Sequence, residues 1–308
     1  MSHKEYVYKK VEGGQPLEAS VWYKQGGSDA PKPIEAHYFH GGNWVLGHKD
    51  MLSPHYVEKL LELGFGAVVS PNYRLGPTIS AQEGPVQDAK DSYLWSQEEL
   101  PSILAKEANI QLDGSKIVAF GHSAGGTLAL LMASLPQKPL AIIDIFGLKY
   151  FDDAFYHNPN PAFAKIPDFE ETLLNRVRDD VPAPNAAAPP GGPNGPDFSN
   201  YRVAWLFTAF KKGSWLSSIQ PDGNYDAIDP SKLFSPSFPP TYFIHGNKDT
   251  LVDVRFAKQA SEELNNKGVE TKLVIEEAPH GFDMGSKPGE HRYNVVTEGF
   301  KFLASHAI

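Results

Sequence analysis

The sequence contains no cysteine among its 308 residues. A disulfide framework, a thiolate nucleophile and a cysteine-ligated zinc site are therefore excluded. The sequence also lacks any run of about 18 apolar residues, and its first residues, MSHKEYVYKK, lack the apolar centre of a signal peptide, so we expect neither a membrane span nor a cleaved leader. We accordingly expect a soluble, cytoplasmic protein.

Positive charge is scarce as well. Lys and Arg number 28 against 37 Asp and Glu, which gives a net charge of −9, and the basic residues form no stripe or block. Nucleic acid is therefore not expected as a partner. No HExxH motif or cluster of histidines and carboxylates indicates a metal site, and no G-x-G-x-x-G or phosphate-binding loop indicates a nucleotide cofactor.

The sequence does contain a regular alternation of short apolar runs with longer helical patterns, which is typical of a mostly parallel sheet covered by helices on both faces. We expect strands at YVYKKV, LEASVWY, IEAHYF, GAVVSPN, KIVAFG, LAIIDIFG, TYFIHG and TKLVIEE. The first two, joined through GGQP, should pair as an antiparallel hairpin. Helices are expected in residues 51–64, 85–109, 125–135, 254–268 and 291–306. The prediction is a single α/β domain over residues 1–308 with about eight strands.

One segment interrupts this alternation. Residues 148–239, hereafter the insert, contain no clear strand and are too long for a plain loop. Within the insert, residues 182–196 contain six Pro and three Gly, which indicates an extended or mobile connection. The rest is rich in Phe, Tyr and Trp. We expect the insert to be a cap or lid over an apolar pocket, although the aromatic side chains could equally form a small core of its own.

The pattern G-x-S-x-G occurs in KIVAFGHSAGGTLALL, between a β-branched run and a helical pattern. Gly121 and Gly125 leave room for a turn so sharp that Ser123 is held in a strained conformation with its hydroxyl above the sheet. The start of the helix would also favour negative charge developing at that point. Ser123 is therefore predicted to be a nucleophile.

A serine hydroxyl needs a base to take its proton, and in this strand–turn–helix architecture the base follows the nucleophile along the chain. His280 lies in APHGF, just past the strand TKLVIEE, at the edge of the sheet where ligands meet open α/β sheets. The other downstream histidines fit a structural or solvated role better. They are His157 in the insert, His245 at a strand end, and His291 and His306 in the last helical pattern. His280 is the predicted base.

A carboxylate must orient that histidine. Asp249 follows the strand TYFIHG and lies at the same edge of the sheet, although Asp is also common in turns and at helix starts. Asp253 is a second candidate but more plausibly begins the next helix. Asp152 and Asp153, after the strand that precedes the insert, are a third possibility. We predict Asp249.

Acyl transfer also needs N–H groups directed at an oxyanion. The residue after the nucleophile, Ala124, can supply one. The loop FHGGNWVLG, which follows the strand IEAHYF, can supply the others, with the backbone amides of Gly42 and Asn43 as the predicted donors. A plain turn would account for the paired glycines but not for their occurrence beside GHSAG.

With these motifs placed, the chain resembles the α/β-hydrolases, and in particular the hormone-sensitive-lipase-like esterases and the neighbouring arylformamidase-like group. PNYRLGP and EGPVQDAKDSYLW are similar to the Tyr-Arg-Leu segment of these proteins and to the helix that carries their Asp and Trp. The resemblance implies an α/β-hydrolase fold and a carboxylic ester hydrolase with Ser123, Asp249 and His280 as its triad.

Two departures from the lipase-like pattern concern the substrate. Asn43 and Trp44 follow HGG where the lipase-like group has a further glycine, and this is closer to the arylformamidase-like pattern. The chain also enters its first strand within about ten residues, so a cap must come mainly from the insert. Our hypothesis is a cofactor-independent serine hydrolase of a small ester. The alternatives are an amide hydrolase of the arylformamidase type and a non-catalytic small-molecule receptor on the same scaffold.

Overall fold

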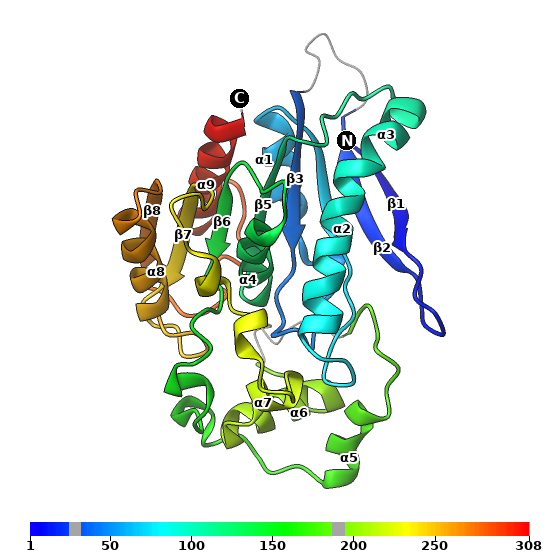
Figure 1. The fold of residues 1–308 in the computed structure, drawn as a ribbon. Helices are drawn as coiled ribbons and strands as arrows, with labels where there is room; N and C mark the ends of the chain where they lie inside the picture. Colours follow the sequence, from blue (N-terminus) through cyan, green and yellow to red (C-terminus); the bar gives the residue numbers. More distant parts are fainter. Residues whose placement is uncertain (25–31, 187–194, 308) are drawn as a thin grey trace.

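The computed structural model describes residues 1–24, 32–186 and 195–307, and their strands form one eight-stranded sheet in the order β1-β2-β4-β3-β5-β6-β7-β8 (Figure 1). At one edge, β1 (Ser2–Lys9) pairs antiparallel with β2 (Leu17–Tyr23), which pairs antiparallel with β4 (Phe65–Pro71). All remaining neighbours are parallel. The predicted mostly parallel sheet, with its antiparallel hairpin, is confirmed.

The central strands are mostly apolar, and both faces of the sheet are covered. They are β3 (Lys32–Phe39), β5 (Ile117–His122), β6 (Ile142–Ile145) and β7 (Thr241–Gly246), and β8 (Thr271–Glu276) forms the far edge. All described residues of β6 and β7 are buried, whereas β8 is only partly buried. Strands that are buried on both sides lose the alternation of apolar and polar residues, which explains runs such as IIDI and TYFIHG.

Helices on opposite faces of the sheet supply this cover (Figure 1). One face carries α1 (Pro54–Glu62) and α9 (His291–Ala307); the other carries α2 (Gln87–Glu98), α4 (Ala124–Leu131) and α8 (Arg255–Asn266). The segment predicted as one helix over residues 85–109 is divided, because α2 ends at Glu98 and α3 (Leu100–Ala108) begins again with Pro101 in its first turn. Proline has no N–H to donate to the preceding turn, so it suits a helix start and not a helix interior.

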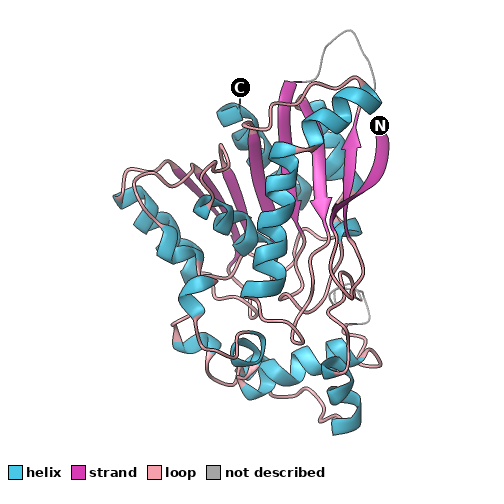
Figure 2. Cartoon of the chain, turned by 45° about the vertical axis from the view of Figure 1, so that its right-hand side comes forward, coloured by secondary structure: helices cyan, strands magenta, loops and turns pink. Residues whose placement is uncertain are grey.

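The insert lies beyond the carboxyl ends of the parallel strands, between β6 and β7 (Figures 1 and 2). Its described parts, residues 148–186 and 195–239, contain α5 (Glu171–Asn175), α6 (Tyr201–Lys212) and α7 (Trp215–Ile219) and no strand. The side chain of Asn200 caps the start of α6, and Gly213, with a positive φ of 67°, ends it. Residues 187–194 of the proline-rich connection lie outside the described residues.

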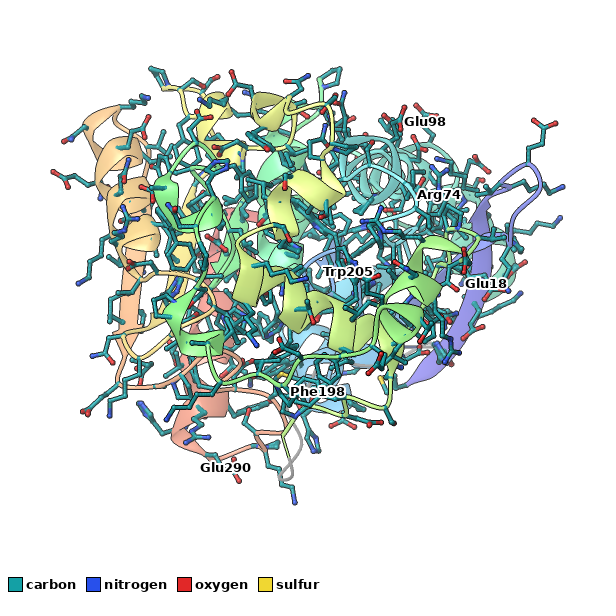
Figure 3. The ribbon with its side chains drawn as sticks, turned by 90° about the horizontal axis from the view of Figure 1, so that it is seen from below. Glu18, Arg74, Glu98, Phe198, Trp205 and Glu290 are labelled. Atoms are coloured by element: carbon teal, nitrogen blue, oxygen red, sulfur yellow. The ribbon has the colours of Figure 1, made fainter. Side chains whose placement is uncertain are left out.

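The aromatic side chains of the insert pack against one another around α6. Phe207 meets Phe163 and Phe198 edge to face, and Phe163 stacks on Phe210 at a centroid distance of 5.2 Å. Seen from the insert side, α6 crosses the middle of the molecule, and Trp205 lies near its centre (Figure 3). The helix therefore contributes to a small core inside the insert. Across the described ranges, none of the helices combines the length and apolar character needed to cross a bilayer.

Candidate active site

Ser123 occupies the sharp turn between β5 and α4. Its φ of 55° and ψ of −126° are strained for a residue with a side chain. The turn is held by backbone hydrogen bonds from the Ser123 amide to the Ile145 carbonyl, at 2.8 Å, and from the Gly126 amide to the Ser123 carbonyl, at 2.8 Å. Such strain persists only where the surroundings enforce it, as these bonds do.

The two glycines of GHSAG are required by close backbone packing. A Cβ atom at Gly121 would lie 2.2 Å from the Gly125 carbonyl oxygen, and one at Gly125 would lie 2.0 Å from the Phe39 carbonyl oxygen. Both distances are far inside van der Waals contact, so no other residue fits without moving β3 or α4. The turn thus brings Ser123 close to the end of β3, where the glycine-rich loop begins.

His280 and Asp249 come from two loops at the same edge of the sheet. The Nδ1 atom of His280 lies 2.6 Å from Oδ2 of Asp249, and this carboxylate is fully buried. Oδ1 of Asp249 accepts hydrogen bonds from the amides of Leu251 and Val252, at 2.8 and 2.9 Å. Oδ1 of Asp249 therefore stabilises the turn that follows it, as Asp side chains often do, and Oδ2 is available to the imidazole of His280.

A second histidine contacts the same carboxylate and was not assigned to the site from the sequence. Nε2 of the buried His245 lies 3.1 Å from Oδ2 of Asp249 and 3.0 Å from the Val252 carbonyl oxygen. Burial alone would raise the pKa of Asp249, but His280, together with hydrogen bonds from His245 and His280, holds that pKa well below its usual range. The only indication of this contact in the sequence is that His245, at the end of a strand, precedes Asp249 by four residues.

The competing carboxylates have other partners. Asp253 accepts from the Arg255 amide at the start of α8 and pairs with the Arg255 guanidinium. Asp153 also pairs with Arg255, and Asp152 pairs with Lys232. The remaining downstream histidines, His157, His291 and His306, contact the Phe151 carbonyl, Glu276 and Glu270. Of the candidates considered, the structure brings only Asp249 together with His280.

Hydrogen bonds to two carbonyls of the glycine-rich loop set the direction of the amides that follow them. The Gly41 carbonyl accepts from Nδ1 of His40 at 2.8 Å, and the Gly42 carbonyl accepts from the amides of Val45 and Leu46 at 3.0 and 2.9 Å. In a trans peptide the C=O and the following N–H point in opposite directions. The amides of Gly42 and Asn43 consequently point away from these bonds.

Positive φ angles at three consecutive residues make this loop unusual. Gly42 has a φ of 118°, Asn43 of 52° and Trp44 of 59°. A Cβ atom at Gly42 would lie 2.2 Å from the Leu46 carbonyl oxygen. Asn is among the residues that tolerate the left-handed region, whereas an indole-bearing residue rarely adopts it. The loop therefore depends on its contacts for its shape.

Three such contacts are made by side chains. The indole of Trp44 donates to the Ala124 carbonyl at 3.2 Å, which ties the loop to the turn at Ser123. From the insert, the indole of Trp215 donates to the Asn43 carbonyl at 3.3 Å, and the buried guanidinium of Arg202 donates to the Val45 carbonyl at 3.0 Å. The insert thus holds two carbonyls of the loop in place.

His40, the first residue of HGGN, is neutral and fully buried. Its ring stacks on Tyr73 at a centroid distance of 4.1 Å, and the Tyr73 hydroxyl donates to the His40 carbonyl at 2.6 Å. Burial lowers the pKa of His40 to about 3, although its bond to the Gly41 carbonyl opposes the shift. A carbonyl oxygen only accepts, so Nδ1 of His40 carries the proton.

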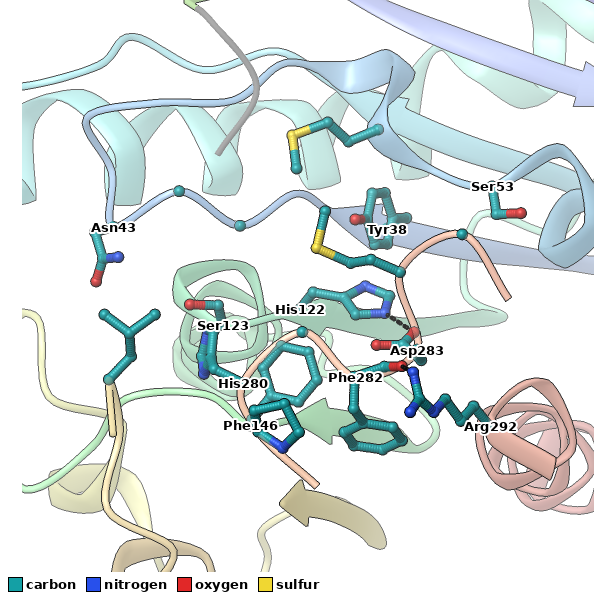
Figure 4. Close-up of a pocket in the computed structure, with 18 of the residues that line it drawn as sticks. Tyr38, Asn43, Ser53, His122, Ser123, Phe146, His280, Phe282, Asp283 and Arg292 are labelled. Atoms are coloured by element: carbon teal, nitrogen blue, oxygen red, sulfur yellow. Dashed lines mark hydrogen bonds and ion pairs between the residues drawn. The ribbon is translucent and has the colours of Figure 1, made fainter. Parts of the chain in front are cut away.

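Four of the six predicted site residues line one cavity of about 420 Å³ (Figure 4). Ser123, His280, Gly42 and Asn43 line it, while Asp249 lies behind His280 and Ala124 follows Ser123 as the first residue of α4. Much of the remaining wall is apolar or aromatic: Tyr38, Met51, Tyr56, Phe146, Leu206, Phe207, Phe210, Leu251, Phe282 and Met284. Leu206, Phe207 and Phe210 come from α6, so the insert forms part of the wall.

A further polar pair on this wall was not predicted. His122, the variable residue of GHSAG before Ser123, contacts the buried Asp283, which lies three residues after His280 (Figure 4). In a sequence, neither the position of His122 before Ser123 nor that of Asp283 three residues after His280 identifies such a pair.

A family model described as an alpha/beta hydrolase fold matches residues 36–148, which include the glycine-rich loop and GHSAG. Two similar curated proteins are the non-reducing polyketide synthases adrD of Penicillium roqueforti, 30% identical over 99% of this chain, and ausA of Aspergillus calidoustus, 31% identical over 95% of it. The chain spans only 14% of the length of each.

Similar solved structures cover nearly the whole chain. A Staphylococcus aureus protein of unknown function has a TM-score of 0.72 at 20% identity, with 100% of both chains covered. Thermogutta terrifontis esterase 2 has a TM-score of 0.63 with propionate bound and 0.64 when phosphorylated by paraoxon, each at 20% identity. Those alignments cover 98% of this chain and 93% and 94% of the esterase chains.

Proposed function

Because the chain has the α/β-hydrolase fold, we propose that it is a serine hydrolase that cleaves a small carboxylic ester through an acyl-enzyme intermediate. The observation that carries the proposal is the 2.6 Å contact between His280 and the buried Asp249, with His280 lining the same cavity as the strained Ser123. A histidine oriented by a carboxylate beside a serine at a strand–helix turn is the arrangement that activates a hydroxyl.

In the proposed mechanism, Asp249 decides which nitrogen of His280 is the base. The Nδ1–H group of His280 donates a hydrogen bond to Asp249, so Nε2 of the neutral ring carries a free lone pair. Nε2 takes the proton of the Ser123 hydroxyl as its oxygen attacks the ester carbonyl, and then gives that proton to the departing alcohol. A water molecule repeats the sequence on the acyl-enzyme, releases the acid and restores Ser123.

The negative charge on the carbonyl oxygen is stabilised by the amides of Gly42, Asn43 and Ala124. The fixed carbonyls of Gly41 and Gly42 support this role, because they leave the next amides directed away from the loop's own bonds. Donors that are oriented in advance need no reorganisation when charge develops, and each is worth about 10²- to 10³-fold in kcat.

The cavity wall favours a substrate with apolar groups on the ester. Its side chains are mostly aromatic or aliphatic, and its volume of about 420 Å³ lies within the usual range for small-molecule sites. The direct test is hydrolysis of a p-nitrophenyl ester by the wild-type protein and by Ser123→Ala. We expect the substitution to abolish turnover, and unchanged activity would rule out Ser123 as the nucleophile.

An amide substrate is the alternative within the same chemistry, and HGGNW favours an aryl formamide. Parallel kcat/KM measurements on an aryl formamide and a matched aryl ester separate the two. A non-catalytic receptor would behave differently, because a serine without an activating base should not react with a fluorophosphonate probe. Covalent labelling that is lost in Ser123→Ala therefore excludes the receptor.

A thioester is a third candidate substrate. The similarity to a segment of polyketide synthases supports it, since polyketide chains are assembled as acyl thioesters. The thioester carbonyl is open to the same attack by Ser123. Comparison of an oxygen ester with the thioester of the same acyl group tests this proposal, and a higher acylation rate on the thioester would favour it.

A further inference from the structure

His122 and Asp283 form a second histidine–carboxylate pair beside the proposed site. Nε2 of His122 lies 2.8 Å from Oδ2 of Asp283, and the side chains are 14% and 1% exposed. The Tyr56 hydroxyl donates to the same oxygen at 3.0 Å and lies 3.3 Å from the Ser286 hydroxyl. Asp283 is therefore held by side chains from β5 and α1.

The surroundings stabilise this pair. The ring of His122 lies among the rings of Tyr38, Tyr56 and Phe146, at centroid distances of 5.6, 6.3 and 5.6 Å. Burial raises the pKa of Asp283, but the neighbouring His122 and the hydrogen bonds from His122 and Tyr56 reverse this and lower it. Separation of the two side chains would leave a buried polar atom of each without its hydrogen bond, which favours the contact.

The contact between His122 and Asp283 joins two segments that carry predicted site residues. His122 immediately precedes Ser123, and Asp283 follows His280 by three residues on the loop that carries the base. Gly281 lies between His280 and Asp283, and Gly285 follows Asp283. Their φ values of 68° and 73° are positive, a backbone conformation that glycine adopts readily. The Asp283 side chain connects this loop directly to the residue before the nucleophile.

We propose that the His122–Asp283 pair is a clamp that sets the position of the His280 loop relative to Ser123. The clamp rests on the proposed serine hydrolase function. His122 and Asp283 are positioning residues. They maintain the position of the base relative to the nucleophile, and they take no part in proton transfer. A displacement of about 1 Å between reacting groups can lower the rate by about 10²-fold. Loss of the clamp should therefore lower kcat by a similar factor.

The test compares His122→Gln with His122→Met. Both side chains are unbranched and similar in length, and the amide nitrogen of Gln can reach the place of imidazole Nε2, whereas Met offers no donor. We expect His122→Met to lower kcat by about 10²-fold with KM within about twofold, and His122→Gln to retain most of the wild-type kcat. The fold loss in kcat should be the same for acetyl, butyryl and aryl esters, because the proposed role of the clamp is to position His280 relative to Ser123 and not to bind the acyl group.

Circular dichroism and thermal unfolding establish that each variant is folded. If His122→Met does not fold, the shorter His122→Asn replaces it, since its amide cannot reach Asp283 and the same loss of kcat is expected. Equal kcat for the donor-bearing and donor-free variants would overturn the clamp, whether both are active or both impaired. A loss confined to KM or to one ester would also overturn it. Failure of the wild-type protein to hydrolyse esters or react with a fluorophosphonate would instead refute the proposed function.

Discussion

The buried histidine at the start of HGGN makes folding stability depend on pH in a way that can be calculated. His40 is fully buried, and its pKa is lowered from an ordinary value of 6.5 to about 3. Between these values the unfolded chain binds a proton at this position and the folded chain does not. Stability is therefore fully present above pH 6.5 and is lost as the pH falls.

The magnitude follows from proton linkage. One proton bound only by the unfolded state changes the free energy of unfolding by about 1.4 kcal/mol per pH unit, so His40 alone should cost about 2 kcal/mol between pH 7 and pH 5. The full effect, reached below pH 3, is about 5 kcal/mol, a large part of the 5–15 kcal/mol typical of a folded domain.

The measurement is urea unfolding at pH 7 and pH 5 for the wild-type protein and for His40→Asn. Asn retains an N–H near the position of Nδ1 and can donate to the Gly41 carbonyl, but it does not titrate. Every other histidine is common to the two proteins, so the difference between their pH slopes belongs to His40. Between pH 7 and pH 5, we expect the free energy of unfolding of His40→Asn to fall by about 2 kcal/mol less than that of the wild-type protein. Equal slopes would refute a neutral, buried His40, whatever the absolute stability of the variant.

Two further predictions concern the proposed catalytic groups. Replacement of Asn43 by Gly should leave kcat/KM for an ester within about threefold, because its φ of 52° suits glycine and only its backbone amide is proposed to act; a loss of about 10²-fold or more in a folded variant would show that the side chain contributes. Asp249→Asn should lower kcat by about 10⁴-fold with little change in KM, because an amide in place of Oδ2 no longer selects the tautomer of His280; steady-state kinetics of the folded variant would contradict this if kcat fell by less than about tenfold.

The main features of the fold could be predicted from local patterns. Runs such as IIDI and TYFIHG are apolar because both faces of the sheet are covered, and the helical segments between them have apolar residues at helical spacing. The break between α2 and α3 was missed, because the apolar pattern continues through it. The internal arrangement of the insert could not be predicted either, since its aromatic contacts join residues distant in the sequence, such as Phe163 and Phe207.

The candidate site was predictable where a residue type, a strand end and the chain order coincide. Ser123, Asp249 and His280 each follow a strand at its carboxyl end, and the parallel sheet brings these ends together. His245 was assigned a structural role because it still belongs to a strand, yet its ring reaches the Asp249 carboxylate. Contacts of this kind depend on side-chain direction in three dimensions, which periodicity does not report.

The insert bonds that support the glycine-rich loop have a consequence for how a hydrolase of the proposed kind could change its substrate. Trp215 and Arg202 donate to the carbonyls of Asn43 and Val45, while Leu206 and Phe207, from the same part of the insert, line the cavity. Selection for a larger or smaller substrate would act first on those cavity residues. Because they share α6 with Arg202, a shift of that helix would also disturb the loop. Adaptation to new substrates should therefore proceed by side-chain replacement on a fixed α6, and insertions or deletions should be confined to parts of the insert remote from Trp215 and Arg202.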